Sequence, residues 1–179
     1  MAHFSLLSLW KLEAPIDRVW AALHDSAAWP TWWRYVARVT PLHPGAANGE
    51  GSRWRLVWRT ALIYSLAFEA RVVRVQPPHV LDAETRGELS GTGRWRLSES
   101  AGITEARYEW NVATTKRWMN MLAPLLTPAF RWNHERVMAA GAAGLARHLG
   151  VRLLSAESAP LTGAASQRRI DDDSNRSTR

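Results

Sequence analysis

The sequence contains no cysteine, so a disulfide framework and thiolate chemistry are both excluded. It has no uninterrupted run that approaches the roughly 18 apolar residues needed by a membrane-spanning helix. The first fifteen residues, MAHFSLLSLWKLEAP, carry neither a basic leader nor the long apolar core of a signal peptide. These absences predict a cytoplasmic protein without stable membrane insertion.

Lysine is scarce too, with two lysines against 21 arginines in a chain of net charge +7. The arginines are dispersed and alternate with apolar residues, as in RWRLVWR at residues 53–59, which is typical of the solvent-facing side of a sheet. No basic block with interleaved exposed aromatic residues occurs, so nucleic acid is not an expected partner. The positive charge leaves open binding to an anionic ligand or to an anionic membrane surface.

Motifs for metals and cofactors are missing as well. The six histidines are scattered, and the two that share a predicted helix face, His134 and His148, lie about four turns apart. The glycine-rich loop PGAANGEGS, residues 44–52, does not lead from a strand into a helix as a phosphate-binding loop does. The G-x-S-x-G pattern of serine hydrolases does not occur. We therefore expect no metal and no cofactor.

From Gly51 onward, apolar residues recur at every second position. Trp54, Leu56 and Trp58 share one face of a predicted strand, and the arginines beside them share the other. The same alternation recurs around residues 64–72, 81–89, 94–97 and 105–112. The turn signals QPPH, SGTG and SAGI separate these runs at hairpin distances. Together with the run YVARVTPLH, the pattern predicts a six-stranded antiparallel meander.

Helices are predicted before and after this meander. A first strand, HFSLLSLWKL, is followed by a short helix that begins at Pro15 and by a second one at SAAWPTWW. A long helix is predicted to start near Thr127 or Pro128, because prolines kink or restart helices. It is expected to end at Leu149, with Gly150 as its stop signal.

The length of 179 residues fits one domain with a single core. We predict that this domain covers residues 1–154. The remaining residues, 155–179, are small, polar and without a periodic apolar pattern, so they are predicted to form a disordered C-terminal tail.

This order of elements resembles the helix-grip fold of the START-related or SRPBCC superfamily. The resemblance covers about residues 3–150 and rests on APIDRVWAAL followed by WPTWW, on GELSGTGRW, and on WMNMLAPLLTPAFRWNHERVM. These motifs are most similar to the polyketide cyclase/dehydrase and lipid-transport branch. The resemblance implies an α+β protein with the order β-α-α-β6-α, in which a curved antiparallel sheet wraps around a long C-terminal helix and leaves an internal cavity.

The predicted inward faces give a set of aromatic and uncharged polar candidates for binding a ligand. They are Trp54, Trp58, Tyr64, Phe68, Trp95, Tyr108, Trp110, Phe130, Asn133 and His134. An aromatic lining with a few convergent polar groups is typical of small-molecule cavities. The alternative, that the eleven tryptophans simply fill a solid core, stays open from the pattern alone.

Two of these residues, His134 and Tyr108, are also candidate catalytic residues. An imidazole in an apolar pocket can move a proton to or from a ligand carbonyl or hydroxyl, and Tyr64 and Tyr108 can donate to a carbonyl. No inward carboxylate is predicted to orient His134, so a structural role for this histidine is the alternative.

Three functional hypotheses follow for a protein expected to be a monomer or a homodimer. The first is the binding of a hydrophobic small molecule that is polyketide-like, aromatic or lipid-like. The second, which the family resemblance permits, is an enzyme of the cyclase, aromatase or dehydrase kind that uses His134 and the cavity tyrosines. The third is lipid transfer at anionic membranes.

Overall fold

The computed structural model describes residues 3–60, 64–115 and 117–161, with the backbone alone described over residues 117–127. The elements, in chain order, are β1 (His3–Leu12), α1 (Ile16–His24), a single 3-10 turn η1 (Ser26–Ala28), α2 (Trp29–Trp32), β2 (Val36–His43), β3 (Arg53–Arg59), β4 (Ser65–Gln76), β5 (Val80–Gly87), β6 (Leu89–Ser100), β7 (Ile103–Thr114), α3 (Arg117–Leu149) and β8 (Leu153–Pro160).

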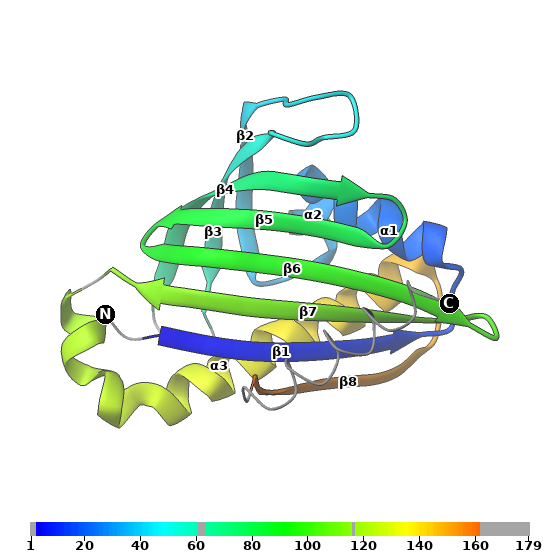
Figure 1. The fold of residues 1–179 in the computed structure, drawn as a ribbon. Helices are drawn as coiled ribbons and strands as arrows, with labels where there is room; N and C mark the ends of the chain where they lie inside the picture. The colour runs from blue at the N-terminus through cyan, green and yellow to red at the C-terminus, as the bar shows by residue number, and fades with distance from the viewer. Residues whose placement is uncertain (1–2, 61–63, 116, 162–179) are drawn as a thin grey trace, which may run out of the picture.

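The strands form one antiparallel sheet in the order β2-β3-β4-β5-β6-β7-β1-β8. Figure 1 shows that the sheet is curved and that α3 crosses one of its faces, with α1 and α2 near one end. The predicted six-stranded meander corresponds to β2 to β7. The α+β helix-grip fold is therefore confirmed.

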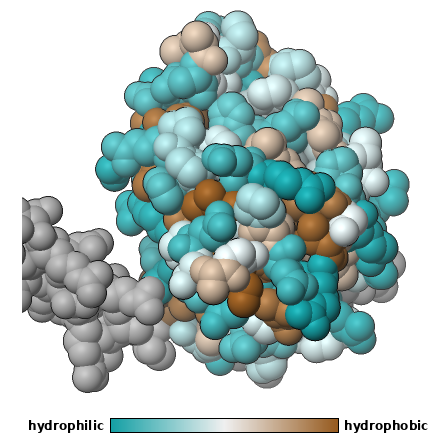
Figure 2. Space-filling view, turned by 90° about the vertical axis from the view of Figure 1, so that its right-hand side faces the viewer, coloured by the Kyte–Doolittle hydropathy of each residue, from teal (hydrophilic) through white to brown (hydrophobic). Residues whose placement is uncertain are grey.

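The two faces of the sheet have the predicted composition. Leu56, Phe68 and Trp95 are buried on the side of α3, whereas Arg53 and Arg55 of β3 are exposed. On the outer face, Arg55 pairs with the cross-strand Glu69 at 2.9 Å. Figure 2 shows that hydrophilic residues cover most of the end of the molecule near α1. Within the described residues, no helix is long and apolar enough to cross a membrane.

One predicted turn is wrong, because the SGTG segment lies inside β6 and the chain reverses at Gly87 and Glu88 instead. The glycines of this segment permit close approach between strands. A Cβ atom on Gly91 would overlap the carbonyl oxygen of Asn111, and one on Gly93 would overlap the Tyr108 hydroxyl. The absence of a side chain, rather than turn formation, is what these positions require.

The predicted domain boundary is also wrong, because residues 155–160 form most of β8 rather than the start of a disordered tail. This edge strand pairs with β1 from Leu6 opposite Pro160 to Leu12 opposite Leu153. Residues 155–160 are mostly small and have no apolar alternation, so no periodic signal marks this strand. Backbone hydrogen bonds to a distant strand stabilise it instead. The rest of the predicted tail, from residue 162, lies outside the described residues.

The long helix begins earlier than predicted, at Arg117 rather than near Thr127 or Pro128. Pro124 and Pro128 therefore lie within it. Figure 1 shows that its yellow-green N-terminal part is strongly curved. Proline removes one backbone donor and crowds the preceding turn, which bends a helix without necessarily ending it.

Packing is tightest around the C-terminal half of α3. A Cβ atom on Gly141 would overlap the Trp33 ring, and one on Gly144 would overlap the Trp32 carbonyl oxygen. The Trp33 indole also donates a buried hydrogen bond of 2.8 Å to the carbonyl of Val137. The helix therefore lies close to its neighbours at these two glycines, and the space between helix and sheet lies toward the other half of α3.

Candidate functional site

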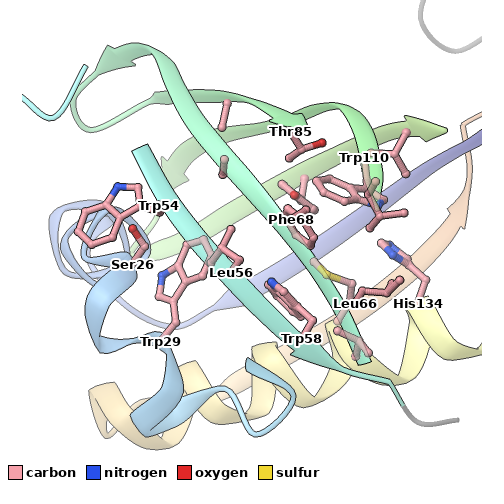
Figure 3. Close-up of a pocket in the computed structure, with 18 of the residues that line it drawn as sticks. Ser26, Trp29, Trp54, Leu56, Trp58, Leu66, Phe68, Thr85, Trp110 and His134 are labelled. Atoms are coloured by element: carbon pink, nitrogen blue, oxygen red, sulfur yellow. The ribbon is translucent and has the colours of Figure 1, made fainter. Parts of the chain in front are cut away.

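A cavity of about 240 Å³ lies between the concave face of the sheet and α3. Its lining from α3 comes from residues 130–138, which precede the tight contacts at Gly141 and Gly144. All ten residues predicted from the sequence border this one cavity, namely Trp54, Trp58, Tyr64, Phe68, Trp95, Tyr108, Trp110, Phe130, Asn133 and His134. Figure 3 shows several of them pointing into the same space from the sheet and from the helix.

Stacked aromatic rings form one wall of the cavity. The Tyr108 ring lies 4.4 Å from the Trp95 ring and 5.7 Å from the Trp110 ring, measured between centroids. Phe68 extends the row, with its centroid 6.0 Å from that of Trp110. Gly93 lies directly opposite Trp110 across β6 and β7 and leaves room for these rings. The wall is therefore a rigid, mostly apolar surface suited to a flat ligand.

Among the residues whose side chains the structure describes, the lining contains no aspartate or glutamate, and Arg59 is its one lysine or arginine. Burial raises the pKa of Tyr64 to about 12 and raises the pKa of Tyr108 as well. Burial also lowers the pKa of His134 to about 4, because an apolar environment disfavours the imidazolium ion. Near neutral pH, all three of these side chains are therefore uncharged.

His134 joins the helix to two strands. Its Nε2 lies 3.1 Å from the Ser8 hydroxyl oxygen on β1, and that oxygen lies 2.8 Å from the Ser158 hydroxyl oxygen on β8. Ser8 is completely buried, so its hydroxyl depends on these two partners. Figure 3 shows the His134 side chain directed from α3 toward Trp110. The structural and proton-transfer roles considered for this histidine are thus compatible with one another.

Two residues that line the cavity each have a buried polar atom without a hydrogen-bond partner among the described residues. These atoms are Nε1 of Trp58, on β3, and Oγ1 of Thr85, on β5. Thr85 is only 3% exposed. A buried polar group without a partner costs about 1–3 kcal/mol, so each of these atoms favours a ligand that supplies one.

Several cavity residues were not named as site residues from the sequence. Phe4 and Leu6 come from β1, and Trp29 comes from α2. Thr85 lies on the inward face of the strand whose alternation spans residues 81–89. Nothing local in the sequence shows that its hydroxyl lacks a partner among the described residues. The motif WPTWW contains Trp29, whose ring centroid lies 6.4 Å from that of Trp58. This contact depends on where α2 lies relative to β3 in the folded protein, which the local sequence does not show.

Within residues 3–60, 64–115 and 117–161, no group of three or more metal-ligating side chains comes together. The cavity therefore offers a ligand aromatic surface, hydroxyl and indole donors, and the imidazoles of His24 and His134.

Comparison with solved structures shows the same fold in proteins of low sequence identity. The Zhui aromatase/cyclase of a Streptomyces species is 17% identical, with a TM-score of 0.68 over 83% of this chain and 94% of that one. The di-domain aromatase/cyclase BexL is 21% identical, with a TM-score of 0.66 over 84% of this chain and 51% of that one, so this chain spans about half of BexL. A Thermus thermophilus protein is 14% identical, with a TM-score of 0.63 over 80% of this chain and 98% of that one.

No curated protein matches the sequence. The family model described as polyketide cyclase/dehydrase and lipid transport matches residues 11–150, which include all the cavity residues discussed above except Phe4 and Leu6. The match covers most of the chain and agrees with the resemblance that the sequence motifs carry. The chain belongs to the polyketide cyclase/dehydrase and lipid transport family.

Proposed function

We propose that this protein binds a neutral, hydrophobic small molecule that contains a ring system and carbonyl or hydroxyl oxygens, as polyketides do. The observation that carries this proposal is an apolar cavity lined by Trp58 and Thr85, whose buried Nε1 and Oγ1 atoms have no hydrogen-bond partner among the described residues. A ligand oxygen can accept from the indole N–H and can accept from or donate to the threonine hydroxyl.

The size of the cavity supports a ring-containing ligand. Its volume of about 240 Å³ exceeds the ~150 Å³ of an engineered apolar cavity that holds one benzene molecule. There is room for more than one ring, and the stacked wall of Trp95, Tyr108 and Trp110 favours planar surface.

The electrostatics of the lining support a neutral ligand. A carboxylate buried in an apolar cavity needs a charged or strongly donating partner. Arg59 is the one arginine or lysine that lines the cavity within the described part of the chain, and its side chain is exposed at the end of β3. A charged group on the ligand would therefore lie at this rim rather than against the aromatic wall.

Catalysis of cyclisation, aromatisation or dehydration is the second candidate function. It is favoured by the position of His134 and Tyr108 on the same cavity, since such reactions need a proton donor or acceptor at the ligand. Lipid transfer is the third candidate, supported by the family description. Binding of a ring-containing ligand is common to the first two candidates and is tested first.

Three naphthalene derivatives of similar size, titrated by calorimetry, test the binding proposal. We expect 2-acetylnaphthalene, which has a carbonyl acceptor, to bind more tightly than 2-ethylnaphthalene and than the anionic 2-naphthoate. The Thr85→Val and Trp58→Phe variants each remove one of the two polar groups. The variant that removes the group bonded to the acetyl oxygen should bind the acetyl compound about fivefold more weakly, since a neutral hydrogen bond contributes ~1 kcal/mol. The ethyl compound should bind these variants and the wild type equally.

The Ala83→Phe variant is the control for the location of binding, because Ala83 lines the cavity and a larger side chain there should exclude all three compounds. The Thr85→Val change should also stabilise the free protein by about 1 kcal/mol, because it replaces an unpaired buried hydroxyl with a methyl group. Equal affinity of the wild type for the acetyl and ethyl compounds would contradict the proposed role of the unpaired donors.

A further inference from the structure

The inward face of β1 contains a polar residue where its neighbours are apolar. Leu6, Trp10 and Leu12 alternate with outward residues and are buried, and Ser8 takes the same inward position between them. Its register places it opposite Tyr108 on β7 and opposite Ser158 on β8. A fully buried hydroxyl at such a position needs hydrogen-bond partners, and the protein supplies them from α3 and from the sheet edge.

These partners form a continuous chain of three groups. Nε2 of His134 lies 3.1 Å from Oγ of Ser8, and Oγ of Ser8 lies 2.8 Å from Oγ of Ser158. Ser158 belongs to the edge strand β8 and is partly exposed. At the opposite end of the chain, His134 borders the cavity. The three side chains therefore connect the cavity to the surface at the edge of the sheet.

A hydrogen-bonded chain of this kind has two directions. In one, the Ser158 hydroxyl donates to Ser8, Ser8 donates to Nε2 of His134, and the imidazole carries its proton on Nδ1. In the other, Nε2–H donates to Ser8, Ser8 donates to Ser158, and Nδ1 carries a lone pair. Nδ1 has no hydrogen-bond partner within the part of the chain that the structure describes. Reversal of the chain therefore converts Nδ1 from a donor into an acceptor.

We propose that Ser158, Ser8 and His134 form a proton relay through which the imidazole exchanges a proton with a cavity ligand while staying neutral. When a ligand gives its proton to Nδ1, the Nε2 proton passes to Ser8, the Ser8 proton to Ser158, and the Ser158 proton to water. The reverse sequence delivers a proton to the ligand. Ser8 and Ser158 are positioning residues in this account, and His134 is the group that meets the ligand.

The relay resolves a difficulty of a histidine base at this site. Burial lowers the pKa of His134 to about 4, so only about one molecule in a thousand carries an imidazolium at pH 7. A base that had to become charged would be strongly disfavoured there. Removing the Nε2 proton as Nδ1 gains one avoids the charged state. The relay rests on the proposed function in one respect, because the group that gives its proton to His134 is a ligand bound in the cavity.

Nitrogen-15 NMR of the His134 ring, on the full chain without any ligand at pH 7, tests the relay. In the wild type, both ring nitrogens should show shifts between those of a protonated and an unprotonated imidazole nitrogen, because both directions are populated. Ser158→Ala removes the acceptor for the Ser8 proton, so Ser8 must donate to Nε2. The Nε2 signal should then move to the value of an unprotonated nitrogen, and the Nδ1 signal to that of a protonated one.

Two further variants separate this change in the His134 tautomers from a nonspecific change in the structure around the histidine. Ser158→Thr retains a hydroxyl on an edge strand and should restore the wild-type shifts. Ser5→Ala removes an exposed hydroxyl from the same strand as Ser8 and should leave them unchanged. Identical tautomer populations in the wild type and Ser158→Ala, or a charged imidazole at pH 7, would overturn the relay. Because no ligand is present, either outcome is independent of the naphthalene titrations.

Discussion

Deletion of residues 155–179 is expected to lower the melting temperature by about 10 °C or to prevent folding. This deletion removes most of β8, which pairs with β1 over Leu6 to Leu12, and it removes the Ser158 partner of the buried Ser8. Loss of several ladder hydrogen bonds at roughly 0.5–1.5 kcal/mol each amounts to about 4 kcal/mol. For a chain of this length, each kcal/mol corresponds to about 2–4 °C.

A shorter deletion, of residues 162–179, is the matched control for this experiment. It leaves every contact that the structure describes in place, including the bond from the Leu161 amide to the Ser5 carbonyl. Its melting temperature should match that of the full chain. If the two truncated proteins melted at the same temperature, β8 would not contribute to stability as the structure indicates.

The Gly144→Ala substitution is expected to destabilise the protein by about 2–4 kcal/mol. Alanine normally stabilises a helix interior by about 1 kcal/mol relative to glycine. Here, however, the added Cβ atom would overlap the carbonyl oxygen of Trp32, and a backbone atom in a packed core cannot move away cheaply. The substitution would push α3 away from α2 and from the tryptophan cluster around Trp33.

Urea denaturation measures this effect, with Ala139→Gly as the control for helix propensity. Ala139 is exposed on the same helix, so its replacement should cost only about 1 kcal/mol. A Gly144→Ala protein as stable as the wild type would show that the helix lies further from α2 than the structure places it.

The part of the fold that the sequence predicts well is the part governed by local periodicity. Alternation in β3 to β7 fixed which residues face α3, because a strand that is buried on one side repeats every two residues. The ten predicted residues border one cavity because the inward faces of these strands and of α3 enclose the same space.

The missed features all depend on contacts between distant segments. β8 has small residues and no alternation, and it is stabilised by pairing with β1, which is more than 140 positions away in the sequence. Helix α3 continues through Pro128, although local chemistry favours a break there. The partnership of His134 with Ser8 joins positions 126 residues apart. That Thr85 Oγ1 has no partner among the described residues depends on its neighbours in the folded protein, which local sequence does not show.

Thr85 illustrates how stability and binding oppose each other in this cavity. Its hydroxyl is buried against an apolar wall and costs free energy in the free protein. A sequence selected for stability alone would favour valine on such a strand face. The threonine is explained if a ligand oxygen completes its hydrogen bonding.

Native mass spectrometry of the protein purified from its own host tests the central claim most directly. We expect a non-covalent complex with one neutral molecule that contains rings and oxygen atoms. This molecule should be displaced by 2-acetylnaphthalene and should be missing from the Ala83→Phe variant. A complex with a phospholipid, or a bound molecule that the Ala83→Phe variant retains, would contradict the claim that the cavity between the sheet and α3 holds a neutral ring-containing ligand.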